Sequence, residues 1–165
     1  MTALKDRAQL VITLASERRM TLATVESCTA GSFVHLLSQA EGASETLHGG
    51  FVVYTKENKV ASLGVPADLI ARHTAVSADV ALAMAHGGLA RCPAGLVVSI
   101  TGVAGPEPDE DGNPVGLVYV AAADRDGRER VVRKDLGNQP KSEICAAAMR
   151  EALTLIEGLL RAQVP

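Results

Sequence analysis

The chain has 165 residues, of which 47% are hydrophobic and 21% are charged. This length suits one domain and this composition suits a packed core, which excludes a disordered chain. The formal net charge of -3 and the lack of a basic stripe exclude nucleic acid as an expected partner. No apolar run reaches the roughly 20 residues that span a bilayer, so we expect no membrane contact.

The N-terminus and the cysteines together predict a cytoplasmic protein. Charged residues come early, and the short apolar stretch after them does not form a signal peptide. The cysteines, at positions 28, 92 and 145, are odd in number and match no zinc spacing. The four histidines form no metal-binding pair, so we expect neither a metal nor another cofactor.

The first half of the chain alternates between helical and extended patterns. Residues 4–18 carry a helical apolar stripe, and residues 21–25 are typical of a short strand. A polar segment at 26–31 leads into an apolar helix that ends near Leu37. Gly49 and Gly50 precede a second predicted strand, 51–54.

Capping residues mark the helices that follow. Thr55 is suited to cap a helix over 56–63, and Pro66 suits the first turn of another helix. Ser77 is a plausible N-cap for a helix through Ala90.

The second half of the chain predicts three strands and a long helix. The strands are 96–100, 115–123 and 129–134, and the helix runs from about Pro140 to near Arg161. The acidic stretch 107–111 is expected to be solvated. The whole pattern predicts an α/β fold: a single-domain sandwich over residues 1–165, in which helices cover both faces of a mixed, largely parallel sheet.

Three unusual loops follow predicted strands, at 26–31, 54–59 and 101–106. In α/β sheets, binding sites gather at the carboxyl ends of the strands. We therefore expect these loops to form one site.

Ser27 lies between a predicted strand and a predicted helix, where free backbone N–H groups can stabilise an oxyanion. It is a candidate nucleophile, but a serine here more commonly only caps the helix. Cys28 is a rival nucleophile, since a helix N-terminus can lower a thiol pKa. No nearby histidine activates it, so a packing cysteine is the better interpretation.

Lys56 and Lys59 are three residues apart and would share a helix face. Surface lysines are ordinarily only solvated. A lysine that acts as a base must be neutral, and an unperturbed pKa leaves only ~0.04% of it neutral at pH 7. Burial and a neighbouring cation would have to lower the pKa to about 7.5, which takes ~4 kcal/mol.

The loop 101–106 contains two glycines and a proline after Thr101. Such a loop can turn backbone N–H groups toward a phosphate or carboxylate. It does not match the P-loop pattern, and an ordinary tight turn explains it equally well.

Five ordered segments resemble the CinA C-terminal domain family, the nicotinamide mononucleotide deamidases. The match consists of five family segments in chain order. Residues 26–31 correspond to E-S-C-T-G-G, and residues 50–59 correspond to G-x-V-x-Y-[ST]-x-x-x-K. The later segments are H-x-A-V-S at 73–77, [ST]-G-x-A-G-P at 101–106 and P-V-G at 114–116. The resemblance covers nearly the whole chain. Many members carry a separate N-terminal domain, and this chain resembles the stand-alone form.

The resemblance implies hydrolysis of the nicotinamide carboxamide to nicotinate mononucleotide and ammonia, without a metal or cofactor. It implies Ser27 as nucleophile, Lys59 as base and Tyr54 as a supporting hydroxyl. It also implies a homo-oligomer whose partner is a small-molecule pyridine nucleotide. The expected substrate-binding residues are Glu26, Thr29, Ala30, Gly31, Lys56, Thr101, Gly102, Ala104 and Gly105.

The chain departs from the family pattern near the expected site. Ala30 replaces a glycine, Lys56 stands where many members have asparagine, and residues 137–140 replace a G-D-R segment that supplies an arginine. The acidic stretch 107–111 also replaces a glycine-richer one. These changes motivate two alternatives: a weak or inactive nucleotide-binding regulatory module, and an amidase for a related amide.

Overall fold

The computed structural model describes residues 2–162 and contains one sheet of five strands. The strands are β1 (Leu22–Glu26), β2 (Leu47–Val52), β3 (Leu96–Gly102), β4 (Leu117–Asp124) and β5 (Glu129–Asp135). Their order across the sheet is β2-β1-β3-β4-β5. Met1 and residues 163–165 of the expected domain lie outside the described residues.

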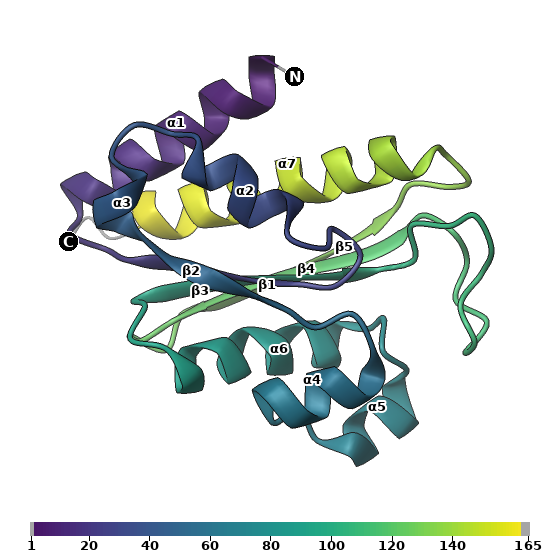
Figure 1. Ribbon diagram of the computed structural model, residues 1–165. Helices are drawn as coiled ribbons and strands as arrows, with labels where there is room; N and C mark the ends of the chain where they lie inside the picture. The colour runs from purple at the N-terminus through teal and green to yellow at the C-terminus, as the bar shows by residue number, and fades with distance from the viewer. Residues whose placement is uncertain (1, 163–165) are drawn as a thin grey trace.

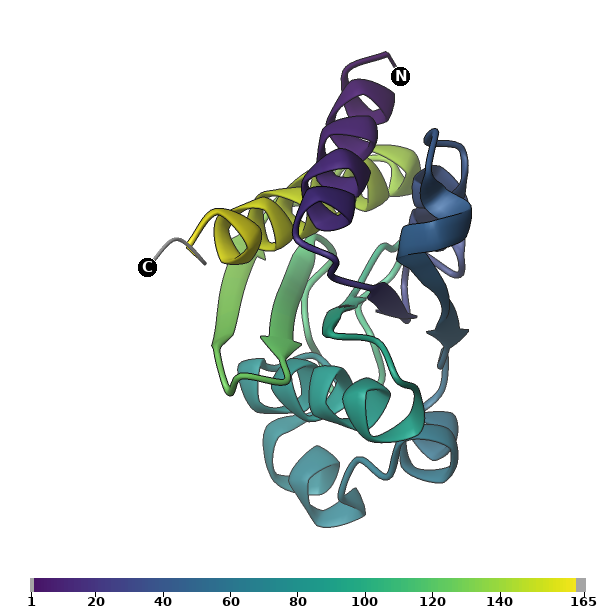
Figure 2. The ribbon, with the colours of Figure 1, turned by 90° about the vertical axis from the view of Figure 1, so that its left-hand side faces the viewer.

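Helices cover both faces of this sheet (Figures 1 and 2). One layer contains α1 (Thr2–Glu17), α2 (Ser32–Ser38), α3 (Ala43–Thr46) and α7 (Lys141–Arg161). The other layer contains α4 (Lys56–Leu63), α5 (Ala67–His73) and α6 (Ala78–Arg91). Among residues 2–162, no helix combines the length and apolarity needed to cross a membrane.

The sheet is mixed, which confirms the predicted fold class. β1 pairs in parallel with β2 and with β3, whereas β4 is antiparallel to both of its neighbours. β1 and β3 are buried along almost their whole length, as expected for strands with helices on both sides. Parallel pairing brings the carboxyl ends of β1, β2 and β3 to one edge.

Two large hydrophobic clusters lie on opposite sides of the sheet, and a third, small cluster contains Val76, Val103 and Leu117. The larger cluster joins α1, α2 and α7 to the sheet, and it includes the fully buried Phe33. The second large cluster joins α4, α5 and α6 to the opposite face. Most core residues are aliphatic, in accord with a composition of only two phenylalanines and two tyrosines.

The capping predictions are confirmed. The Thr55 hydroxyl oxygen accepts the Asn58 backbone N–H at 3.1 Å, and α4 begins at the next residue. The Ser77 hydroxyl oxygen accepts the Val80 N–H at 3.3 Å at the start of α6. The first cap decides where Lys59 lies, because it fixes the phase of α4.

The structure also adds one unexpected helix and corrects one predicted strand boundary. α3 was not expected, and β2 begins at Leu47 rather than after the two glycines. Gly50 lies inside the strand, beside Thr24 of β1. A Cβ at this position would collide with Thr24 Oγ1, so the strands can pack this closely only with glycine here. Gly50 therefore permits close strand packing instead of marking a turn.

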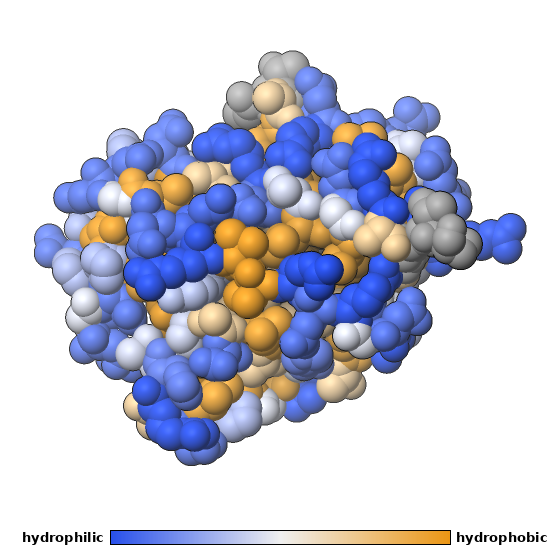
Figure 3. Space-filling view, turned by 180° about the vertical axis from the view of Figure 1, so that it is seen from behind, coloured by the Kyte–Doolittle hydropathy of each residue, from blue (hydrophilic) through white to orange (hydrophobic). Residues whose placement is uncertain are grey.

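The side opposite that of Figure 1 carries a patch of apolar surface between hydrophilic side chains (Figure 3). β5 forms the edge of the sheet on this side (Figures 1 and 2). Val131 in this strand is 37% exposed. This patch lies away from the loops described next.

Candidate active site

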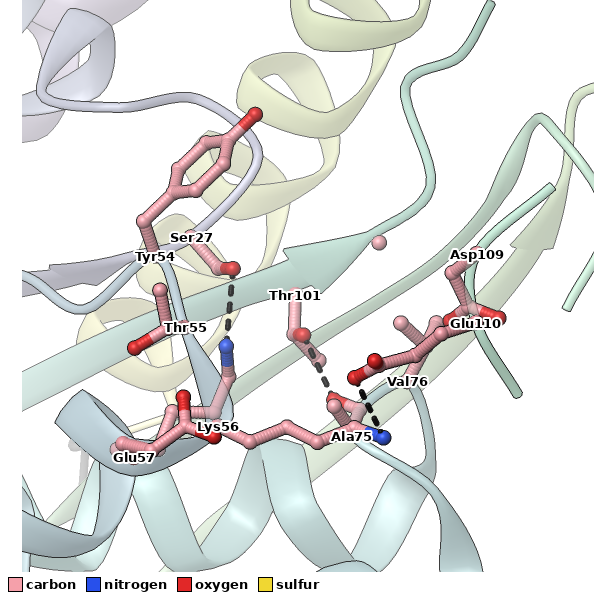
Figure 4. Close-up of a pocket in the computed structure, with 12 residues that line it drawn as sticks. Ser27, Tyr54, Thr55, Lys56, Glu57, Ala75, Val76, Thr101, Asp109 and Glu110 are labelled. Carbon is pink, nitrogen blue, oxygen red and sulfur yellow. Dashed lines mark hydrogen bonds and ion pairs between the residues drawn. The ribbon is translucent and has the colours of Figure 1, made fainter. Parts of the chain in front are cut away.

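The loops that follow β1, β2 and β3 meet around a cavity of about 450 Å³. The turn after β1 supplies Ser27, the segment after β2 supplies Tyr54 and α4, and the end of β3 supplies Thr101 and Gly102. Figure 4 shows these side chains around one opening. The expectation that the three loops form one site at the carboxyl edge agrees with this arrangement.

Ser27 and Lys59 are in direct contact at the base of this cavity. Lys59 Nζ donates a hydrogen bond to Ser27 Oγ at 3.0 Å and another to the Val53 carbonyl at 3.1 Å. The Ser27 backbone N–H donates to the Ile100 carbonyl at 3.0 Å, which ties the serine to β3. Ser27 is 6% exposed and Lys59 is 2% exposed, so both are fixed by packing.

Burial lowers the pKa of Lys59 to about 8. Loss of hydration is the main cause, and the positive charge of Lys56 acts weakly in the same direction. Cys28 and Glu57 act in the opposite direction. With a pKa of about 8, about a quarter of the lysine is neutral at pH 7.5. A neutral amine in contact with a serine hydroxyl is the arrangement of a serine–lysine nucleophile and base.

Glu26 does not line the cavity, contrary to the expectation of substrate contact. Its carboxylate is fully buried and accepts the N–H groups of Gly31, Phe33 and Val34 at 3.0, 3.0 and 2.7 Å. It also accepts the Thr24 hydroxyl at 3.2 Å. The carboxylate is therefore committed to anchoring the turn after β1.

This anchoring corrects the expected source of oxyanion stabilisation. The first N–H groups of α2 already donate to Glu26, so the helix N-terminus has no free donors to offer. Among the described residues, the amides of Cys28 and Thr29 donate to no protein acceptor. Cys28 follows the candidate nucleophile Ser27, and the residue after a nucleophile is a frequent position for an oxyanion donor.

Three other expected substrate contacts also lie outside the cavity. Thr29, Ala30 and Gly31 form the turn between Ser27 and α2, and none of them lines the opening. Ala30 and Gly31 both have left-handed backbone conformations, with φ of 49° and 92°. They shape the turn between Ser27 and α2 and do not line the cavity.

Replacing Ala30 with glycine is expected to stabilise the protein. An L-residue in the left-handed region costs about 1–2 kcal/mol, and the entropy of glycine offsets part of this gain, which leaves roughly 0.5–1 kcal/mol. Urea unfolding measures the change. The control is Ala61→Gly in α4, where the same substitution should instead destabilise by about 1 kcal/mol. A loss of stability with Ala30→Gly would show that the backbone of Ala30 is not strained.

Thr101 lines the cavity, but its hydroxyl is engaged by the fold. It is buried and donates to the Ala75 carbonyl at 2.9 Å (Figure 4). Gly102 lies at the same wall, where a Cβ would come within 2.8 Å of Val118. Ala104 and Gly105 line a neighbouring cavity of about 180 Å³ that shares Ser27 and Tyr54 with the first.

The Tyr54 ring stands beside both cavities and is 58% exposed. Its hydroxyl points away from the Ser27–Lys59 pair (Figure 4). The ring therefore forms a wall of the site, and its hydroxyl is not in position to support the pair.

Lys56 points along the cavity toward the acidic stretch. Its ammonium nitrogen is 2.8 Å from Glu110 Oε1 and 2.8 Å from Asp111 Oδ1. These carboxylates raise the pKa of Lys56. The stretch 107–111 is solvated, as expected, since all of it except the half-buried Asp109 is exposed. In addition, Glu110 and Asp111 lie against Lys56 of α4. The participation of Asp109 and Glu110 in the lining was missed, although their position just after the loop 101–106 was a usable signal.

The fold and these contacts define an α/β protein with a serine–lysine pair in a cavity at the carboxyl edge of its parallel strands. Residues 4–160 match the CinA C-terminal domain, so the chain belongs to this family.

The chain is similar to known proteins both in sequence and in structure. A CinA-like protein of Gemmatimonas aurantiaca is 44% identical over 78% of this chain, and one of Anaeromyxobacter sp. is 40% identical over 93%. The matched parts cover only 30% and 37% of those relatives. A competence/damage inducible protein CihA from Agrobacterium tumefaciens has a TM-score of 0.91 and 35% identity, covering 94% of each chain. A CinA superfamily protein of Escherichia coli has a TM-score of 0.89 and 31% identity, covering 94% of this chain and 90% of its own.

Proposed function

We propose that this protein is an amide hydrolase that converts nicotinamide mononucleotide to nicotinate mononucleotide and ammonia. The observation that carries this proposal is the buried contact of 3.0 Å between Lys59 Nζ and Ser27 Oγ, with the lysine pKa lowered to about 8. The resemblance of the motifs around both residues supports the choice of substrate. A cavity of about 450 Å³ is also suited to a molecule of this size.

In the first half of the proposed reaction, Ser27 Oγ attacks the carboxamide carbon while neutral Lys59 accepts the serine proton. The Cys28 N–H is the nearest candidate donor to the resulting oxyanion. When the carbon–nitrogen bond breaks, Lys59 returns the proton to the departing nitrogen, which leaves as ammonia. Lys59 carries this proton itself, because the Tyr54 hydroxyl points away from the pair.

The second half releases the acid product. Water attacks the acyl-serine carbonyl and gives a proton to Lys59. The carbon–Oγ bond then breaks, and Lys59 returns the proton to Ser27, so the enzyme is regenerated. The hydrogen bond from Lys59 to the Val53 carbonyl keeps the amine directed at the serine through both halves.

The direct test is ammonia release from nicotinamide mononucleotide by the purified protein, with the acid product identified by its mass. Binding of this compound without ammonia release would favour a nucleotide-binding regulatory module. Ammonia release from another amide but not from this one would favour an amidase with a different substrate. Either result would overturn the proposed reaction.

The rate should depend on pH through Lys59. Only neutral Lys59 accepts the serine proton, so kcat/KM should rise about tenfold per pH unit below the lysine pKa and level off above about 8. Initial rates between pH 6 and pH 9 measure this profile. A profile that stays flat across this range would show that Lys59 is not the base.

A further inference from the structure

Two cavities share the surface around Ser27. One has a volume of about 450 Å³ and the other of about 180 Å³, and their linings differ except at four residues. These shared residues are Ser27, Tyr54, Gly102 and Asp109. In the proposed reaction the Ser27 hydroxyl contacts the carboxamide carbon, so the group bonded to that carbon meets the surface that the two cavities share.

In the proposed substrate this group is a pyridinium ring. Its positive charge is centred on a nitrogen only a few bonds from the reacting carbon. The reduced, dihydropyridine form of the same nucleotide carries the same carboxamide on an uncharged ring. A charged protein group at the shared surface therefore binds the two forms with different affinities.

Asp109 is the charged residue of the shared surface. Figure 4 shows it on the far side of the opening from Ser27. Among the described residues Asp109 forms no ion pair, whereas its neighbours Glu110 and Asp111 both contact the Lys56 ammonium nitrogen at 2.8 Å. No protein cation therefore neutralises the carboxylate that faces both cavities.

The Asp109 carboxylate is also fixed in position. Its Oδ1 accepts the backbone N–H groups of Asp111 and Asn113 at 3.0 and 2.8 Å. The Asn113 side-chain amide donates to Asp109 Oδ2 at 2.8 Å and to Thr74 Oγ1 at 3.0 Å, which ties the carboxylate to the segment before α6. A charge that is already ordered loses little entropy when it meets a ligand, so it contributes more to binding than a mobile one.

We propose that Asp109 is a specificity-determining residue, which makes the site select the amide on the cationic, oxidised ring over the same amide on the neutral, reduced ring. This inference rests on the proposed amide hydrolysis, because that reaction brings the ring to Ser27. Asp109 is half-buried, so water screens its attraction for the ring less than it would at an open surface. The neutral ring gains nothing from this charge.

The test measures the dissociation constants of oxidised and reduced nicotinamide mononucleotide by calorimetry in Ser27→Ala, in which turnover is blocked. In S27A/D109N the preference for the oxidised form should fall about tenfold at low salt, because only the cationic ring loses an attraction. With Ser27 intact, Asp109→Asn should raise KM for the oxidised form about tenfold and leave kcat within about twofold.

Two control variants separate charge from structure. Asp109→Glu keeps the charge but alters the hydrogen bonds of the loop, so it should keep the preference for the oxidised form. A purely structural role would instead weaken both forms alike in Asp109→Asn and Asp109→Glu. Asp126→Asn removes one exposed carboxylate from the turn between β4 and β5, at the opposite edge of the sheet, and should leave the preference unchanged.

The inference and the proposed reaction can fail separately. An unchanged preference in S27A/D109N, or binding of neither form, would overturn the role of Asp109. Ammonia release by the wild-type protein is measured alongside. A tenfold loss of preference without ammonia release would retain Asp109 as the residue that reads the ring charge while the proposed hydrolysis fails, and ammonia release with an unchanged preference would do the reverse.

Discussion

Ser27→Ala is expected to reduce ammonia release from nicotinamide mononucleotide by at least about a thousandfold, because no other group is placed to form the acyl intermediate. Cys28 is the adjacent alternative, but burial raises its pKa to about 12, so its reactive thiolate is scarce. The measurement is the initial rate of ammonia release near pH 8.

The fold should survive this substitution. Among the described residues, the Ser27 hydroxyl forms a hydrogen bond only with Lys59, and the backbone hydrogen bond from Ser27 to Ile100 does not depend on the side chain. The matched control is Ser99→Ala, a buried serine of β3 whose hydroxyl donates to the Ala81 carbonyl at 2.6 Å. That variant should lose about 1 kcal/mol of stability yet keep most activity. If Ser27→Ala keeps its activity, Ser27 is not the nucleophile.

Local signals in the sequence were sufficient for most of the fold. The caps at Thr55 and Ser77 and the long helix that begins after Pro140 depend on contacts within one turn of chain. The periodicity of apolar residues and short continuous apolar runs predicted the central strands. The loops that follow three of these strands then predicted where a site would form, because parallel strands bring their carboxyl ends together.

Contacts over longer distances explain what the sequence did not reveal. Glu26 stands beside Ser27 in the chain, yet its carboxylate turns toward N–H groups five to eight residues later. Lys56 meets Asp111 across 55 positions, and no local pattern predicts that pair. The roles of both side chains are decided by tertiary packing rather than by neighbouring residues.

The departure at Ala30 was visible in the sequence, but its consequence was not. Ala30 has a left-handed backbone conformation, with φ of 49°, which is strained for an L-residue and is not strained for glycine. Ser27, which precedes this turn, is in direct contact with Lys59.

Lys59→Met is expected to stabilise the protein at neutral pH while it abolishes activity. Burial lowers the pKa of Lys59 to about 8 from its ordinary value of 10.5. Below pH 8 the lysine is charged in both the folded and unfolded states, and the folded state bears the whole cost of the buried charge. Between about pH 8 and pH 10.5 the unfolded state binds more protons, so the free energy of unfolding of the wild type rises with pH.

The expected gain at pH 7 combines two opposing contributions. Removing a buried charge with this pKa relieves a cost on the order of 3 kcal/mol. Losing the hydrogen bonds to Ser27 and to the Val53 carbonyl costs about 1 kcal/mol or more, since that carbonyl is left without its lysine partner. A net gain of about 1–2 kcal/mol remains, and methionine fills a similar volume in the apolar pocket.

Urea unfolding at pH 7 and at pH 9.5 separates this effect from ordinary repacking. The wild type should become more stable relative to Lys59→Met at the higher pH, because its lysine is then largely neutral when folded. Lys5→Met, at an exposed position of α1, should show no such dependence. If Lys59→Met is less stable than the wild type by the same amount at both pH values, the lysine is not charged in the folded protein at pH 7. Because the charge that destabilises the fold is on the group that we propose as the base, activity and stability should respond to this one substitution in opposite directions.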